Sequence, residues 1–423
     1  MPGRITQMRI SRVESWLVAV PFIRPIRSAY GVSYPARVRS IIRLTTDDGI
    51  TGIGETGPSA VHAFSLEEWR LQFERDSTPT LLGLDPFHPA AVRRALRWTD
   101  AATAAEIACY DIMGKATERR VCELLGGLPA STTMPVAGYA FFHADVNDDA
   151  EAPDELLHVV TRLVCDRGFQ TVKLKLGVYD PVTEVELVRA IRQAHPHIEL
   201  RVDANGAWSI PTALRVMRQL ADFNLQYIED PIRDSPLGAS LSILSGRTID
   251  FEGFCRLRAA VPIPLCADNC YRLDLLREII YRRAADVVLA DVFGCGGLSA
   301  SMRWISLAET FHLGIGMHSG TELGIGQLAK AHVMAAVEGR GYAMDSIYDE
   351  YEGDVLHGGK IAVANGLMRM PETPGLGADL DEHELGRFEL TPARKAELDD
   401  FWTELRRTTK SETVDSSLVA HSF

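Results

Sequence analysis

The stretch "TVKLKLGVYD", residues 171–180, has the pattern of a buried β-strand, yet it carries two lysines with a single leucine between them. Lys173 and Lys175 point to the same side, because side chains alternate between the two faces of a strand. Lysine is among the residues least often buried without a partner. We therefore expect this side of the strand to face a polar site.

Seven further stretches repeat the order of a short apolar strand followed by a segment with apolar residues three and four positions apart. Strands that alternate with helices predict a parallel sheet, and eight such units predict a closed (β/α)8 barrel. The other predicted strands are "MPVAGYAF" (134–141), "ELRVDA" (199–204), "LQYIED" (225–230), "IPLCAD" (263–268), "DVVLAD" (286–291), "GIGMHS" (314–319) and "YAMDSI" (342–347).

Other regions flank the barrel. Strands predicted in residues 12–22 and 37–55, with an Asp-Gly turn in the second stretch, and a helix in 104–119 indicate an α+β domain. The tail, residues 408–423, has the composition of a frayed terminus. The predicted division of the chain is an α+β domain over 1–130, the barrel over 131–375 and a C-terminal segment over 376–423.

Composition limits the classes of partner. The net charge of −13 and the absence of a basic run argue against nucleic acid and anionic membranes, so a small-molecule substrate is expected. The first residues lack the features of a secretory signal, which favours the cytoplasm. Seven scattered cysteines fit reduced thiols, although Cys266 and Cys270 leave a metal-binding pair as an alternative.

Polar residues end the predicted strands, at the mouth of the barrel where catalytic residues gather. An Asp or Asn at such a place can also simply cap the next helix. Capping does not explain two inward lysines. The polar residues at the strand ends are Lys173, Lys175, Asp203, Asn205, Glu229, Asp230, Asp268, Asn269, Asp291, His318 and Asp345.

Three of these carboxylates predict a metal site. Asp203, Glu229 and Asp268 end consecutive strands, and three converging anions repel one another unless a cation lies between them. Oxygen ligands suit Mg²⁺. Asn269 is an alternative third ligand, and Asp230 is expected to be a structural partner.

The lysine pair predicts a general base. Residues two apart on a strand lie about 6.6 Å apart, and two ammonium groups at that distance repel by roughly 2.5 kcal/mol at an effective dielectric near 20. Lys175 or Lys173 can then lose its proton near neutral pH. Grip on a phosphate or carboxylate by both lysines is the alternative. On the opposite arc, a carboxylate at Asp291 is expected to fix the tautomer of His318 for proton transfer.

Taken in order, these motifs resemble the enolase superfamily in its mandelate racemase branch. The resemblance covers nearly the whole chain and implies abstraction of a proton α to a carboxylate, with Mg²⁺ stabilising the enediolate. It also implies that the N-terminal domain caps the barrel and that the C-terminal segment returns to it. The motifs are "DDGITGIGE" (47–55), "KLK" (173–175), "VDANGAW" (202–208), "IEDP" (228–231), "CADN" (266–269), "ADVFGCGGL" (290–298), "GIGMHS" (314–319) and "PGLGADLD" (374–381).

The resemblance assigns roles to individual residues. It implies Lys175 as the base on one face of the substrate, with Lys173 as its electrostatic neighbour, and His318 with Asp291 as the acid/base on the other face. The remaining implied roles are metal ligation by Asp203, Glu229 and Asp268, contact with the enolate oxygens by Asp345, and a place in the catalytic group for Asn205.

Within the branch, the motifs look most like glucarate dehydratase and related acid-sugar dehydratases, with a homo-oligomer, a dimer or octamer, implied. Gly294 replaces the lysine of muconate cycloisomerases. Gly320 and Tyr30 replace an asparagine and a histidine of glucarate dehydratases, so the acid sugar is expected to differ from glucarate. Racemisation, epimerisation or lactone cycloisomerisation by the same bases is the alternative, and a non-catalytic acid-sugar-binding protein is a third reading.

The resemblance also implies that specificity resides in loops of the N-terminal domain that close over the barrel mouth. In "PFIRPIRSAYGVSY" (21–34), Arg24, Arg27 and Tyr30 could bind a distal carboxylate or hydroxyl groups. They could equally be ordinary surface residues.

Overall fold

The computed structural model describes residues 8–57, 66–96, 99–127, 133–145, 151–232, 249–339 and 341–408. The tail predicted over 408–423 lies, from residue 409 onward, outside the described residues. Among the described helices, none has both the length and the apolar character needed to cross a membrane.

All eight predicted barrel strands form. They pair in parallel in the order in which they follow one another, and β14 pairs back with β6. Between β13 and β14, the Tyr342 N–H donates to the Ile315 carbonyl at 2.9 Å. The strands are β6 (Thr133–Ala140), β8 (Thr171–Lys175), β9 (Glu199–Asp203), β10 (Ile228–Glu229), β11 (Leu265–Ala267), β12 (Val287–Ala290), β13 (Gly314–Met317) and β14 (Met344–Ser346).

The register of the barrel aligns the polar strand ends. Lys175 lies beside Asp203, and Asp203 lies beside Glu229 on the next strand. Because neighbouring parallel strands end at the same level, their last side chains share one mouth.

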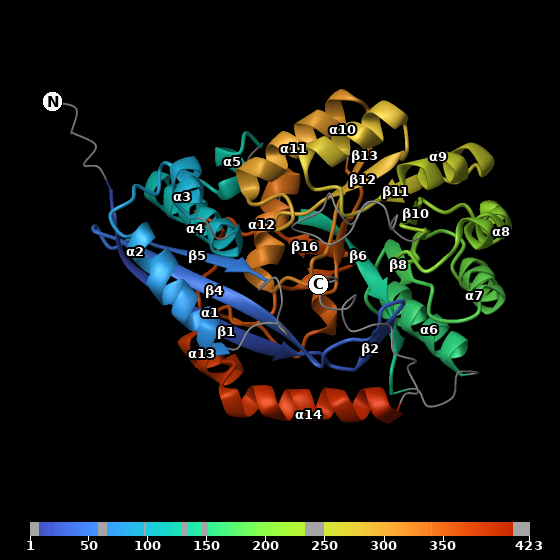
Figure 1. The fold of residues 1–423 in the computed structure, drawn as a ribbon, viewed down its shortest axis with the longest axis horizontal. Helices are drawn as coiled ribbons and strands as arrows, with labels where there is room; N and C mark the ends of the chain where they lie inside the picture. Colours follow the sequence, from blue (N-terminus) through green and yellow to red (C-terminus); the bar gives the residue numbers. More distant parts are fainter. Residues whose placement is uncertain are drawn as a thin grey trace.

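Helices cover the outside of the barrel (Figure 1). Several begin with a side-chain cap, for example Asp180, which accepts from the Val182 N–H at 2.9 Å. The helices are α6 (Ala152–Thr161), α7 (Pro181–Ala194), α8 (Ile210–Leu220), α9 (Phe251–Ala260), α10 (Leu273–Arg282), α11 (Leu298–Thr310) and α12 (Gly324–Ala335). After β14 the chain instead forms β15 (Val363–Ala364) and β16 (Leu367–Arg369), and β16 pairs antiparallel with β6.

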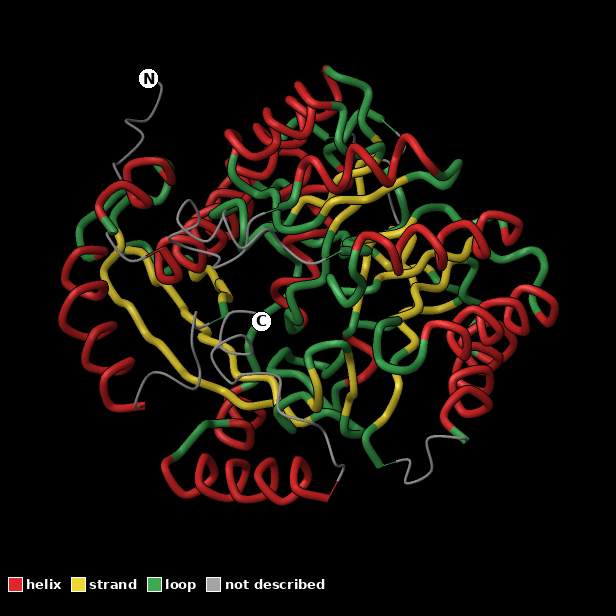
Figure 2. Tube along the Cα trace, turned by 45° about the vertical axis from the view of Figure 1, so that its right-hand side comes forward, coloured by secondary structure: helices red, strands yellow, loops and turns green. Residues whose placement is uncertain are grey.

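The N-terminal capping domain is a three-stranded antiparallel sheet covered by helices, and Figure 2 shows this sheet beside the barrel. Two strand glycines permit close packing on α4: a Cβ at Gly54 would lie 1.9 Å from the Ala104 carbonyl oxygen. The elements are β1 (Ile10–Pro21), β4 (Ala36–Thr46), β5 (Thr51–Thr56), α1 (Leu66–Gln72), α2 (Thr78–Leu81), α3 (Pro89–Ala95), α4 (Thr99–Thr117) and α5 (Val121–Leu124).

Two further features tie the capping domain to the rest of the chain. A small sheet of β2 (Ile26–Ser28), β3 (Gly31–Val32) and β7 (Phe142–His143) joins it to the barrel. The C-terminal helices α13 (Glu382–Phe388) and α14 (Pro392–Thr408) return to it, and Glu389 bridges to Val18 of β1.

Candidate active site

A cavity of about 210 Å³ lies where the barrel strands end, and the capping domain supplies part of its wall. Of the residues expected at the strand ends, Lys173, Asp203, Glu229 and Asp345 are almost completely buried and do not belong to the lining. Those that line the cavity are Lys175, Asn205, Asp268, Asn269, Asp291 and His318.

The two lysines of β8 have different partners. Lys173 Nζ donates to Glu229 at 2.6 Å and to Asp345 at 2.7 Å, whereas Lys175 Nζ donates to Asp203 at 2.6 Å. Burial alone would lower the pKa of Lys173, but the charges of Asp345 and Glu229 outweigh it and hold this pKa well above its usual range. Each lysine of the pair therefore has a carboxylate partner of its own.

Asp203 and Glu229 differ in the direction of their pKa shifts, although both are buried. Burial, followed by the charge of Asp203, raises the pKa of Glu229 well above its usual range. Burial alone would also raise the pKa of Asp203. The charges of Lys175 and Lys173 outweigh burial, and a hydrogen bond from Glu229 acts in the same direction as the lysines, so the pKa of Asp203 is lowered. Asn205 completes the group by donating to Asp203 from its backbone at 2.8 Å and from its side chain at 3.1 Å.

Asp268 is oriented by its neighbours. Tyr271 donates to its Oδ1 at 2.6 Å and Asn269 to its Oδ2 at 3.1 Å. Asp230 accepts from the Asp268 N–H at 3.1 Å, in keeping with the structural role expected for it. Sequence reasoning missed Tyr271, because it lies in a loop where the alternation of a strand no longer reports direction.

The predicted pairing of Asp291 with His318 is wrong. Asp291 Oδ1 accepts from the backbone N–H groups of Phe293, at 2.6 Å, and Gly294, at 3.0 Å, and forms no hydrogen bond with the imidazole in the part of the chain that the structure describes. His318 Nδ1 instead lies 3.4 Å from Asp268 Oδ2. Asp291 lines the same cavity; burial raises its pKa, and the charge of His318 partly opposes this rise.

Asp345 also differs from its expected role. It is fully buried, bonded to Lys173 and 3.1 Å from Arg201 Nη2, so it cannot reach enolate oxygens in the cavity. Burial opposes its charge, but Lys173 and Arg201 lower its pKa to about 2. Sequence analysis did not identify Arg201 as part of this network. Arg201 precedes Asp203 by two residues on β9 and therefore lies on the same face of the strand.

Tyr30 lines the cavity as predicted, but the two arginines near it do not. Arg27 lies over the ring of Tyr179, 5.0 Å from its centre, and donates to its hydroxyl at 3.2 Å. Arg24 donates to Asp145 at 2.8 Å and also pairs with Glu155. The structure therefore places Arg27 outside the cavity lining, and its role in substrate binding stays a prediction.

Arg37 on β4 is the arginine that does line the cavity. Burial and the nearby charge of Arg39 lower its pKa to about 9, which leaves it cationic at neutral pH. Tyr34 and Trp402 line the cavity too, with ring centres 5.5 Å apart. Trp402 belongs to α14. Sequence analysis did not predict it at the cavity wall, because it lies far along the chain from the other lining residues.

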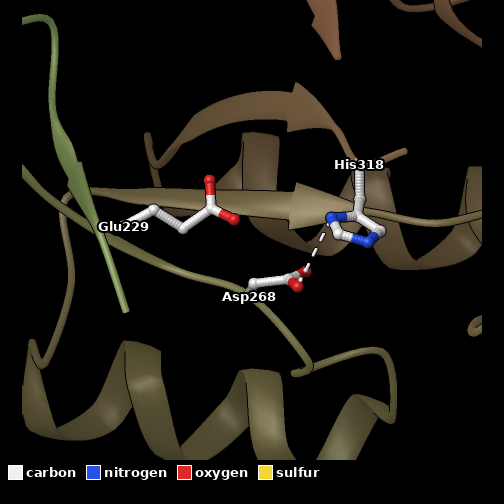
Figure 3. A group of neighbouring side chains, drawn as sticks. All are labelled: Glu229, Asp268 and His318. Atoms are coloured by element: carbon white, nitrogen blue, oxygen red, sulfur yellow. Dashed lines mark ion pairs between the residues drawn. The ribbon is translucent and has the colours of Figure 1, made fainter. Parts of the chain in front are cut away.

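The site fits a divalent cation. Glu229, Asp268 and His318 converge from three strand ends, each offering an atom within 4.8 Å of the others (Figure 3). Asp203 adjoins this group: after burial, the charge of Asp203 is the main cause that raises the pKa of Glu229, and a cation could offset this repulsion. Buried carboxylate oxygens suit Mg²⁺. The ligand set of Asp203, Glu229 and Asp268, with Asn269 as the alternative, stays a prediction.

Comparison with known families agrees with the fold. Residues 12–126 match the mandelate racemase / muconate lactonizing enzyme N-terminal domain, and residues 155–384 match the enolase C-terminal domain-like family. The chain therefore belongs to the enolase superfamily, an enzyme family, in its mandelate racemase branch.

Individual relatives differ in activity. A probable glucarate dehydratase from Streptomyces coelicolor is 32% identical over 87% of this chain and 88% of its own length. An N-succinyl-L-Arg/Lys racemase from Bacillus cereus is 26% identical, over 89% of this chain and 97% of its own. An enolase of Pseudomonas fluorescens, solved with magnesium, potassium and tartrate, superposes with a TM-score of 0.79 at 28% identity, covering 96% of this chain and 97% of its own.

Proposed function

We propose that this protein is a Mg²⁺-dependent dehydratase of acid sugars. The observation that carries the proposal is that Lys175 and His318 line one cavity, each beside a carboxylate that could hold the cation. Lys175 removes the proton α to the substrate carboxylate, and His318 protonates the departing β-hydroxyl. The similarity to a probable glucarate dehydratase supports this reaction over others of the superfamily.

The buried network beside the cavity supports these two groups. Mg²⁺ held by Asp203, Glu229 and Asp268 would supply positive charge beside the substrate carboxylate. Lys173 is fixed between Glu229 and Asp345, so it contributes a constant charge rather than a proton.

Two glycines of the site limit which side chains could replace them, and so which reactions of the superfamily fit. A Cβ at Gly294 would lie 2.2 Å from the ring of Tyr271, so the lysine of muconate cycloisomerases has no room here. A Cβ at Gly320 would lie 2.9 Å from Asp291 Oδ2, so the asparagine of glucarate dehydratases would displace Asp291. The first observation disfavours cycloisomerisation, and the second favours an acid sugar other than glucarate. Arg37 and Tyr30 would contact its distal end.

A library of mono- and diacid sugars, incubated with the protein and Mg²⁺ and followed by mass spectrometry, tests the proposal. We expect a product lighter by one water that reacts as a 2-keto-3-deoxy acid, and no product after exhaustive chelation. Recovery of epimerised substrate of unchanged mass would identify a racemase or epimerase instead. Full activity after chelation would contradict the metal requirement.

A further inference from the structure

The segment that follows His318 is held by a buried ion pair of the capping domain. Arg39 of β4 and Glu55 of β5 are 3% and 0% exposed, and Arg39 Nε lies 3.2 Å from Glu55 Oε1. Neither residue lines the cavity. Both face residues 320–326 of the barrel.

Each member of the pair makes several bonds to this segment. Arg39 donates to the Thr321 carbonyl at 3.0 Å, to the Thr321 hydroxyl at 2.9 Å and to the Gly320 carbonyl. Glu55 accepts from the Leu323 N–H at 2.7 Å and from the Gly326 N–H, in the first turn of α12, at 2.8 Å. Hydrogen bonds to charged groups are about twice as strong as neutral ones.

The backbone between these bonds is strained. Thr321 has a φ of +64°, in the left-handed region that a β-branched residue rarely adopts. Such a conformation costs on the order of 1–3 kcal/mol and persists only where its surroundings impose it. Since Thr321 follows His318 by three residues, relaxation of this turn would move the imidazole.

The capping domain makes a similar contact after the preceding strand. Glu106 of α4 is fully buried and accepts from the Ser299 hydroxyl in the first turn of α11. That helix begins soon after Asp291, the residue that ends β12. Carboxylates of the capping domain therefore lie at the first turns of the two barrel helices that follow Asp291 and His318.

We propose that Arg39 and Glu55 are positioning residues. They hold residues 319–326, here called the His318 loop, in the strained conformation that is active. Docking of the capping domain thus controls the His318 side of the site. The assignment of proton transfer to His318 rests on the proposed function, whereas the control of the loop does not.

Hydrogen–deuterium exchange of the full chain tests the control of the loop without substrate. Glu55→Gln should accelerate amide exchange in residues 319–326 by at least about tenfold, because its NH₂ group cannot accept the backbone bond that one of the two carboxylate oxygens accepts. Arg39→Lys, which keeps the charge, should accelerate exchange at 320–322. The matched control is Asp111→Asn, since Asp111 is also buried and accepts from two backbone N–H groups, of Ile53 and Leu376. Unchanged exchange in 319–326, or equal acceleration in the control, would overturn the proposal.

Kinetics then separate positioning from general loss of stability. With an acid sugar that is turned over, Glu55→Gln should lower kcat about 10- to 100-fold with KM within about threefold and should shift one limb of the pH profile of kcat. Glu55→Asp should restore part of kcat, and the control should keep it. A kcat unchanged in Glu55→Gln would refute the link to His318. If no acid sugar reacts, the proposed function fails, and the exchange experiment still decides whether the pair controls the loop.

Discussion

Lys173 and Lys175 belong to one face of one strand, and their different depths give them different chemistry. The deeper lysine is enclosed by Glu229 and Asp345, while the outer one has Asp203 on one side and the cavity on the other. The inner ammonium is therefore a structural charge. The outer one faces the cavity, as the proton acceptor of the proposed reaction must.

Substitution by methionine should separate these two roles. Lys173→Met leaves buried carboxylates without their cation and should destabilise the fold by about 3–5 kcal/mol. Lys175→Met should change stability far less but lower kcat by about 10²–10⁴. Urea denaturation and initial rates measure the two effects. Equal losses of stability would show that the lysines do not differ in this way.

Arg37 should determine affinity for the distal part of the substrate. Arg37→Met removes a cation from the cavity wall and should raise KM about 10- to 100-fold, the range of a hydrogen bond to a charged group, with less change in kcat. Arg37→Lys should restore part of the affinity. Arg27→Met is the control, because Arg27 contacts Tyr179 outside the cavity. A larger effect in the control would return the distal site to Arg27.

The start of α11 offers a test of how closely the capping domain meets the barrel. A Cβ at Gly297, where φ is +114°, would lie 1.5 Å from Glu106 Oε2. Gly297→Ala should therefore destabilise the protein by about 2–4 kcal/mol, through both strain and displacement of Glu106. Gly296→Ala is the control, since Gly296 also has a positive φ but no atom near its Cβ position. Equal unfolding free energies in the two variants would contradict the proposed close contact.

The strands and their polar ends could be predicted from sequence because buried parallel strands are almost continuously apolar, so each inward polar residue stands out. The hydrogen-bond partners of these polar residues could not be predicted in this way. Lys173 pairs with Asp345, 172 positions away, across the closed barrel. Asp291 turns from His318 to backbone N–H groups of its own loop. Such choices depend on the reach of side chains, which strand periodicity does not contain.

Sequence periodicity also does not predict which segments of the chain form the cavity wall. Arg27 and Arg37 look equally suitable in the sequence, but β2 pairs with β3 and β7 and carries Arg27 toward Tyr179. Trp402 reaches the cavity because α14 returns to the capping domain, where its indole N–H donates to the Val32 carbonyl at 3.2 Å. The homo-oligomer, a dimer or octamer, stays a prediction.

His332 joins the three regions of the molecule and should set their stability in acid. Its Nδ1 accepts from the Cys122 N–H of α5, and its Nε2 lies 3.1 Å from the Leu376 carbonyl. Burial lowers its pKa from 6.5 to about 4. The unfolded chain then binds more protons than the folded one between these values, so this stabilisation is complete above pH 6.5 and is lost as the pH falls to about 4.

The change should amount to roughly 3 kcal/mol over this pH range. Urea denaturation at several pH values measures it, with His332→Asn as the comparison because asparagine does not titrate. The variant should be less stable at pH 7 and should lose less stability on acidification. Parallel pH dependences of the two proteins would show that His332 does not carry the effect.

Proton NMR of the reaction in D₂O tests the dehydratase assignment and its two acid/base groups together. With Mg²⁺ and an acid sugar, the wild-type protein should remove the α-proton and release a 2-keto-3-deoxy product, while Lys175→Ala and His318→Ala, both folded, should release none. Exchange of the α-proton with inversion and without loss of water, or dehydration that survives both substitutions, would contradict the account.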